Sequence, residues 1–159
     1  AIRPTTKTCC RATSAARLRC RPDCCEDEDV LPGHLGNFQI EYLRIAELGG
    51  RRSKSKTVPA DVNGFWDNPS FHNYADYALS DTFRLGLDRL IDIGRDRRCA
   101  MMCAEAVWWR CHRRIVADHL LARHQQVFHL MGDDRIEAAR LTPGAQVLAD
   151  AAVVYPKDA

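Results

Sequence analysis

The ordered hydrophobic pattern of the chain begins near residue 30. Before that point the apolar positions follow neither a period of about 2 nor one of about 3.6 residues, and Ile2 and Leu18 are the only large aliphatic side chains. Such a segment buries too little apolar surface to offset the entropy that is lost on ordering. We therefore expect residues 1–28 to be a disordered or aberrant Cys- and Arg-rich segment, and residues 29–159 to form a single α/β domain.

The first ordered segments are a predicted strand and a loop with two glycines. Residues 39–45 alternate apolar and polar side chains, as a half-buried strand does, with Ile40 and Ile45 facing inward. The strand leads into Leu48-Gly-Gly-Arg-Arg52, where the glycines allow a tight turn or the close approach of a ligand. A short helical stretch follows, and its surroundings are rich in aromatic residues: Phe65, Trp66, Phe71, Tyr74 and Tyr77.

Two further helices and two further strands are expected. Ser80 is a candidate N-cap for a helix that extends to about residue 93. Residues 98–103 form a short apolar run, which is typical of a buried parallel strand, and residues 126–130 form another strand. A helix from residue 109 or 111 to residue 123 connects them, so the order predicts a parallel sheet and an α/β fold. The inner stripe of that helix comprises Ile115, Val116, His119 and Leu120.

The densest group of reactive side chains lies between these last two strands. Cys103 ends the first strand, and Cys111, His112 and Arg113 occupy the first turn of the connecting helix. Ligands of open α/β sheets bind outside the carboxyl ends of the strands. A helix N-terminus at that place favours anions and the thiolate form of a cysteine. Two kinds of chemistry are therefore open.

The first interpretation is a site for a phosphate-bearing ligand, a nucleotide or a nucleic acid, with arginines on the phosphate and aromatic rings on a base. The alternative is a thiol-based enzyme with Cys111 as the thiolate, His112 or Glu105 as its proton partner, and Cys103 as a resolving thiol. Both cysteines can instead be packing residues of the core. A structural metal site at Cys103, Cys111 and His112 lacks a fourth ligand, so no metal is predicted, and the sequence indicates no particular cofactor. The candidate ligand-binding residues are Gly49, Gly50, Arg51, Arg52, Trp66, Tyr74, Arg110 and Arg113.

Composition indicates which class of protein this is, but it does not indicate a particular function. The chain has 159 residues, 46% of them hydrophobic, and its 23 Lys and Arg against 21 Asp and Glu leave a formal net charge of +2. The sequence contains no apolar run of the roughly 20 residues that a membrane helix needs. Eight cysteines are present, and the first residues, Ala-Ile-Arg-Pro-Thr-Thr-Lys, carry no apolar core of signal-peptide length. We therefore expect a reduced, cytoplasmic protein without a membrane partner and without the bulk charge of a nucleic-acid binder.

Four sequence blocks resemble the domain of unknown function 488 family over about residues 29–156. They are Leu48-Gly-Gly-Arg-Arg52, Trp66-x-Asn68-x-x-Phe71-x-x-Tyr74-Ala75-Asp76-Tyr77, Met102-Cys-Ala-Glu-Ala…Trp109-Arg-Cys-His-Arg113 and Leu141-Thr-Pro143. The resemblance implies a Rossmann-like, mostly parallel sheet flanked by helices, in a bacterial cytoplasmic protein. It adds Asn68 to the candidate ligand-binding residues, and it supplies no activity.

The chain departs from the pattern of that family in two places. Many members carry Pro where this chain has Trp108. Members also open with strands that end in Gly-His-Ser and Asp-Val-Arg, and neither sequence is present in residues 1–28. The resemblance therefore implies a sheet that lacks its usual N-terminal strands.

Overall fold

The computed structural model describes residues 30–103, 105, 107–131 and 135–157. These residues fall into two compact units. The first unit comprises residues 30–44, 100–103 and 105, and the second comprises residues 45–99, 107–131 and 135–157. The segment 1–28, which the sequence predicts to be disordered or aberrant, lies outside the described residues. Among the helices of the described part, none has both the length and the apolar character needed to span a bilayer.

The first unit is built on one short helix, α1 (Leu31–Gly36). Its Leu31 and Leu35 side chains are buried. Ile40, Tyr42 and Met102 pack against these two leucines and complete a small apolar cluster. The segment that follows α1 therefore uses its apolar side chains against the helix.

Two of the predicted strands are wrong for this reason. Residues 40–45 and residues 98–103 have no regular secondary structure. Ile40 and Tyr42 come from the first of these segments and Met102 from the second, and all three pack on α1 instead of on the face of a sheet. Alternation of apolar and polar residues thus reflected packing on a helix, because a half-buried extended segment shows the same pattern as a half-buried strand.

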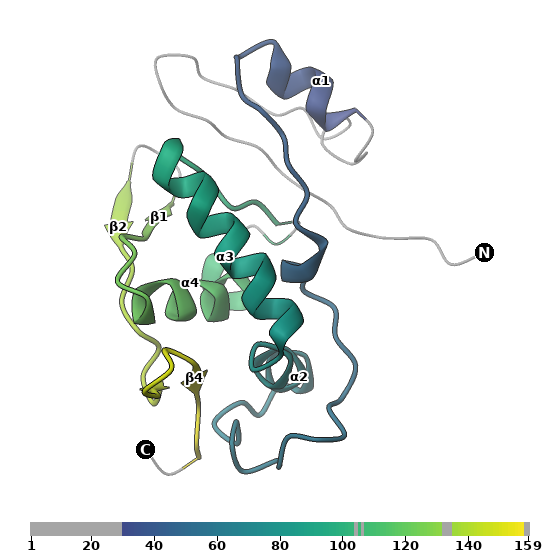
Figure 1. Cartoon of the computed structure of the whole chain (residues 1–159), viewed down its shortest axis with the longest axis vertical. Coiled ribbons are helices and arrows are strands. Elements are labelled where there is room, and N and C mark those ends of the chain that lie inside the picture. Colours follow the sequence, from purple (N-terminus) through teal and green to yellow (C-terminus); the bar gives the residue numbers. More distant parts are fainter. Residues whose placement is uncertain (1–29, 104, 106, 132–134, 158–159) are drawn as a thin grey trace, which may run out of the picture. The chain divides into compact units, whose positions relative to one another are not determined.

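Three helices form the frame of the second unit: α2 (Pro69–Tyr77), α3 (Asp81–Asp96) and α4 (Arg113–Ala122). The unit also contains two 3₁₀ turns. Turn η1 (Ala46–Leu48) precedes α2 in the chain, and η2 (Trp108–Arg110) lies between α3 and α4. Figure 1 shows α4 running across α3, with which it is in contact. The helix expected from residue 109 or 111 begins at Arg113, because the residues before it form η2 and a turn.

Side-chain caps define where α2 and α3 begin. Asn68 Oδ1 accepts a hydrogen bond from Ser70 N at 2.8 Å, and Ser80 Oγ accepts one from Phe83 N at 3.3 Å. Each cap pairs one of the N–H groups that the first turn of a helix leaves without an intrahelical acceptor. The predicted N-cap at Ser80 is confirmed, and α3 continues to Asp96.

The core of the second unit lies between these helices and the C-terminal part of the chain. The inner stripe predicted for α4 is confirmed, since Ile115, Val116, His119 and Leu120 are all buried. Gly86 lets α3 approach η1 closely, because a Cβ atom at that position would lie 2.6 Å from Glu47 Cβ. The largest fully buried aromatic and aliphatic side chains of this core are Tyr74, Tyr155, Phe83, Leu87, Ile115, Val116 and Val153.

The sheets overturn the predicted fold class. Strand β1 (Phe128–Leu130) pairs antiparallel with β2 (Ile136–Ala138), and β3 (Gln146–Val147) pairs antiparallel with β4 (Val153–Val154). These two-stranded sheets are the sheets of the described residues, so the Rossmann-like, mostly parallel sheet is wrong for this part of the chain. The strand predicted over residues 126–130 is present, but its partner follows it closely in sequence. A short connection joins antiparallel strands, whereas a parallel pair requires a crossover.

A buried network of polar side chains joins the C-terminal segment to α4 and α2. Asp118 of α4 accepts hydrogen bonds from the Tyr155 hydroxyl at 2.8 Å and from Thr142 N at 2.9 Å. Asn63 bridges Tyr155 and Asp76: its Oδ1 accepts from Tyr155 N at 3.1 Å, and its Nδ2 donates to Asp76 Oδ1 at 2.8 Å. Because a buried polar group without partners is costly, these bonds specify one position for the C-terminal segment.

Burial shifts the pKa of two neighbouring side chains on α4, Asp118 and His119. It raises the pKa of Asp118, although the hydrogen bonds from Thr142 and Tyr155 act in the opposite direction. It lowers the pKa of His119 to about 3, and the positive charge of Arg123 lowers it further. The His119 ring meets the Phe83 ring edge-on at 4.9 Å between centroids, so the imidazole is held neutral in an apolar place.

Replacing His119 with Leu should make the free energy of unfolding less sensitive to acid. The folded protein keeps His119 neutral down to about pH 3, whereas the unfolded chain binds this proton below about pH 6.5. The contribution of His119 to stability is therefore complete above about pH 6.5 and falls by as much as ~1.4 kcal/mol per pH unit below it. Urea unfolding between about pH 4 and 7 measures this slope. His124→Asn, a change at an exposed histidine, is the control, and equal slopes in both variants would contradict the assignment.

Candidate functional site

Cys111 lies at the junction of η2 and α4. Its backbone N–H donates to Trp108 O at 3.2 Å, which closes the 3₁₀ turn, and its own carbonyl accepts from Arg114 N at 3.0 Å, which opens the helix. Hydrogen bonds thus fix the backbone of this residue on both sides. The side chain is buried, with 2% of the residue exposed.

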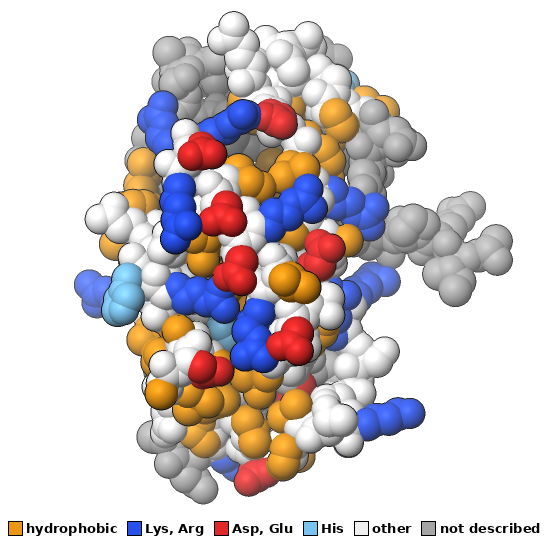
Figure 2. Space-filling model, viewed as in Figure 1, with side chains coloured by type: hydrophobic (Ala, Val, Ile, Leu, Met, Phe, Trp, Pro, Cys, Tyr) orange, Lys and Arg blue, Asp and Glu red, His pale blue; other side chains and the backbone are white. Residues whose placement is uncertain are grey.

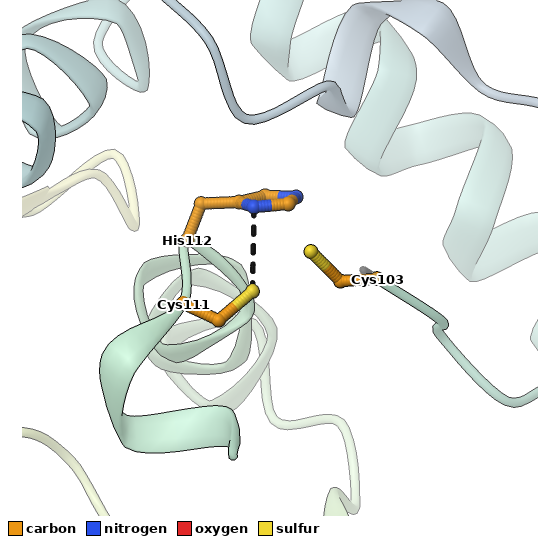
Figure 3. A group of neighbouring side chains, drawn as sticks. All are labelled: Cys103, Cys111 and His112. Atoms are coloured by element: carbon orange, nitrogen blue, oxygen red, sulfur yellow. Dashed lines mark hydrogen bonds between the residues drawn. The ribbon is translucent and has the colours of Figure 1, made fainter. Parts of the chain in front are cut away.

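Three nitrogen atoms surround the sulfur of Cys111. His112 Nδ1 lies 3.4 Å from Sγ, and a dashed line marks this hydrogen bond in Figure 3. Arg113 contributes two donors, its Nε at 3.4 Å and its backbone N at 3.5 Å. Arginine nitrogens only donate, so the sulfur accepts at least two hydrogen bonds. A thiolate accepts such bonds more strongly than a thiol does, and the arrangement therefore favours the charged form of Cys111.

Helix α4 adds to this preference. The N–H groups of its first turn carry a partial positive charge, and the backbone N–H of Arg113 is one of the groups without an intrahelical acceptor. Cys111 Sγ accepts from that N–H, as a capping side chain does. The sulfur thus fills part of the role of an N-cap, for which His112 provides no side-chain bond.

The His112 ring is held by two neighbours from distant parts of the second unit. The Tyr74 ring of α2 lies 5.0 Å away between centroids, at an angle of 55°. The backbone of Gly50 lies against the imidazole, since a Cβ atom there would be 2.4 Å from His112 Nδ1. The predicted Gly-containing loop therefore does come close to the Cys-His-Arg block.

Some of the predicted ligand-binding residues bind to other parts of the protein, and others are exposed or lie near Cys111. The first group comprises Arg52, Trp66, Asn68 and Tyr74. Arg52 Nη2 donates to Ala46 O and Glu47 O at 3.0 and 3.1 Å, and its guanidinium group lies 3.9 Å from the centre of the Tyr77 ring. Asn68 caps α2.

The two aromatic candidates are part of the core. Trp66 is 8% exposed and stacks on Phe71 at 4.9 Å, with the Arg114 guanidinium 5.0 Å from its ring centre. Tyr74 is fully buried, and its hydroxyl donates to Leu48 O at 2.8 Å. Neither ring has a face open to a base in this structure. Of the remaining candidates, Arg51 and Arg110 are exposed, and Arg113 is half-buried against Cys111.

Cys103 and Glu105 belong to the first unit. Cys103 is half-buried and Glu105 is exposed, and the strand that Cys103 was expected to end is not formed. Their proposed roles as resolving thiol and proton partner remain predictions. The contacts around Cys111 that are described above all join residues of the second unit.

Sequence reasoning missed the buried acid on the inward face of α4. Asp118 lies in the apolar stripe of α4, three residues after Ile115 and next to His119, and it is 1% exposed. A carboxylate at an inward position of an amphipathic helix was the available signal, because such a group is rarely buried without a partner. Its partners, Thr142 and Tyr155, lie far along the chain, which sequence spacing does not reveal.

A hollow on another part of the second unit shares none of the candidate residues. Arg95 pairs with Asp92 at 3.0 Å and Arg123 pairs with Asp88, so opposite charges already meet there. Figure 2 shows acidic and basic side chains interspersed over α3, which is the pattern of a solvated helix face. The hollow is lined by Asp88, Ile91, Asp92, Arg95, Arg123 and Gln125.

Comparison with known proteins assigns a family and no activity. The family model described as Domain of unknown function DUF488 matches residues 21–120. The match includes the Gly49-Gly50 loop and the Cys111-His112-Arg113 block, and it ends before β1 and before the Leu141-Thr-Pro143 block. No curated protein and no solved structure matches the chain. The chain belongs to the family of the domain of unknown function DUF488.

Proposed function

We propose that the second unit carries a thiol-based reactive centre with Cys111 as the nucleophile. The observation that supports it is the set of three nitrogen atoms within 3.5 Å of Cys111 Sγ, two of them arginine donors. Structural cysteines of a core pack against apolar groups and do not need such partners. The hydrogen-bond donors around Cys111 would instead stabilise a negatively charged sulfur.

His112 is the proton partner in this proposal. Its Nδ1 lies at hydrogen-bond distance from the sulfur, so in the neutral ring with the proton on Nε2 it accepts the thiol proton. The products of this transfer are a thiolate and an imidazolium, which attract each other. The thiolate then attacks an electrophilic atom of the substrate, and His112 holds a proton that it returns to the leaving group.

Arg113 stabilises the charge that this transfer creates. The guanidinium group of an arginine carries a positive charge, and Arg113 Nε lies 3.4 Å from the sulfur. Burial of Cys111 opposes a charged sulfur, because removing an ion from water is costly unless the ion is paired. Arg113 and the N-terminus of α4 supply that pairing.

Replacing Arg113 with Gln should make Cys111 harder to ionise. We expect the pH midpoint of thiolate formation to rise by about 1 unit or more, because a nearby positive charge and its hydrogen bond are lost. The measurement is the ultraviolet absorbance of the thiolate against pH, taken as the difference between each protein and its Cys111→Ser counterpart. Subtraction removes the signal of the other cysteines. Alkylation of Cys111 by iodoacetamide, followed by mass spectrometry, gives an independent rate.

Arg89→Gln is the matched control, because Arg89 is an exposed arginine on α3. This variant should keep the midpoint of the unsubstituted protein. A Cys111 midpoint at or above the ~8.5 of an ordinary thiol, unchanged by Arg113→Gln, would contradict the proposed centre.

A second candidate function is the binding of a phosphate-bearing ligand at the same place. It is favoured by the two exposed arginines that adjoin the contact between the loop and the helix: Arg51 follows Gly50, and Arg110 precedes Cys111. A phosphate at the N-terminus of α4 would meet the partial positive charge of the helix as well. Because Trp66 and Tyr74 are buried, the phosphate group rather than a stacked base would supply the binding energy.

Inorganic phosphate tests this candidate directly. If phosphate binds beside Cys111, it should slow the alkylation of that sulfur, and the protection should weaken as salt is added. Potassium chloride at equal ionic strength is the control for screening alone. Arg51→Gln and Arg110→Gln should each reduce the protection, whereas Lys157→Gln, at an exposed lysine elsewhere on the unit, should leave it intact. Equal alkylation rates in phosphate and chloride would remove phosphate binding from consideration and leave the thiol centre untouched.

A further inference from the structure

We infer that Gly50 positions His112 against Cys111, and that this contact, rather than ligand binding, is the role of the Gly49-Gly50 loop. The inference rests on the proposed thiol centre and adds to it the device that orients its proton partner. A Cβ atom at residue 50 would lie 2.4 Å from His112 Nδ1 and 2.8 Å from both Cγ and Cε1 of the ring. The atom met most closely is the one that faces Cys111 Sγ at 3.4 Å.

Only glycine fits between the loop and the ring in this arrangement. All three distances are shorter than the closest approach that a real Cβ atom shows, so a side chain at residue 50 forces something to move. The backbone of Gly50 therefore contacts the imidazole and limits the positions that the ring can take. The Tyr74 ring, 5.0 Å from the His112 ring, is its second neighbour.

The loop itself is anchored and cannot retreat easily. Tyr74 Oη donates to Leu48 O at 2.8 Å, and Tyr77 Oη donates to Glu47 O at 2.7 Å. Arg52 Nη2 donates to Glu47 O as well, and α3 lies against the Glu47 side chain through Gly86. Moving the loop would break several of these contacts at once, and the bond from Tyr74 to Leu48 O is buried.

His112 is the part that yields. Its imidazole turns about two side-chain torsions, and its new position would give up the bond to Cys111 Sγ. An alanine at residue 50 should therefore change the chemistry of Cys111 more than the stability of the fold. A larger effect on the chemistry of Cys111 than on the stability of the fold distinguishes a positioning residue from a residue that only packs.

The test is Gly50→Ala in the full chain, with the thiolate midpoint of Cys111 as the readout. We expect the midpoint to rise toward that of an ordinary thiol and the alkylation rate at neutral pH to fall roughly tenfold, the equivalent of one pH unit. At high pH, where the sulfur is ionised in every variant, the rates should converge. A variant that had only loosened the structure would react faster at every pH, because the buried sulfur would become accessible. Gly94→Ala is the control, since a Cβ atom at that exposed glycine meets nothing within 4 Å.

A double-mutant cycle keeps the inference testable if Gly50→Ala folds poorly. His112→Ala removes the ring, so Gly50→Ala added to it should leave the midpoint unchanged and should change the free energy of unfolding no more than Gly94→Ala does. Equal effects of Gly50→Ala with and without the His112 ring would overturn the inference. A lowered midpoint in the unsubstituted protein that Gly50→Ala leaves unchanged would overturn it too, while the proposed thiol centre stands. An ordinary midpoint in the unsubstituted protein would overturn both.

Discussion

The candidate site depends on how the carbonyl oxygens of Glu47 and Leu48 are bound. Two tyrosines of α2 and the guanidinium group of Arg52 donate to them. A carbonyl removed from water needs such a partner, because leaving it unpaired costs much of the hydrogen-bond energy. The bonds fix η1 on α2, while α3 packs against η1 through Gly86, and the loop after η1 lies with Gly50 against His112. The environment of the Cys111 sulfur thus follows from hydrogen bonds made more than thirty residues earlier in the chain.

Helix α4 connects this site to the rest of the second unit. Its N-terminus holds Arg113 against the sulfur, and its inward face carries both the apolar core and the buried Asp118. Asp118 binds Tyr155 and Thr142, so the C-terminal segment is specified by polar contacts as well as by packing. Burial raises the pKa of Asp118 and also that of the Tyr155 phenol, which the negative charge of Asp118 raises further. The phenol of Tyr155 therefore keeps its proton and donates it to Asp118, which suits a structural hydrogen bond better than proton transfer.

The two predicted strands that are not formed show what a pattern of apolar residues cannot determine. Residues 39–45 and 98–103 carry apolar side chains at spacings that suit a strand, yet Ile40, Tyr42 and Met102 cover α1. The 126–130 segment does contain a strand, but Phe128 and Leu130 are exposed, so it is not the buried strand of a parallel sheet. Periodicity reports that one side of a segment is covered. It does not report what covers it, because the partner is chosen by contacts between distant parts of the chain.

The sequence by itself determined the local features of this protein. The Ser80 cap, the inner stripe of α4 and the adjacency of Cys111, His112 and Arg113 depend on residues within one or two helical turns, whose geometry is nearly fixed by spacing. The family also followed from blocks of the sequence. Tertiary structure alone decided the contacts of Arg52, Trp66 and Tyr74, which are candidate ligand-binding residues in the sequence and bind to other parts of the chain in the fold. It alone brought Gly50 to His112, since burial and hydrogen bonding are properties of neighbours in space, and those neighbours are remote in the chain.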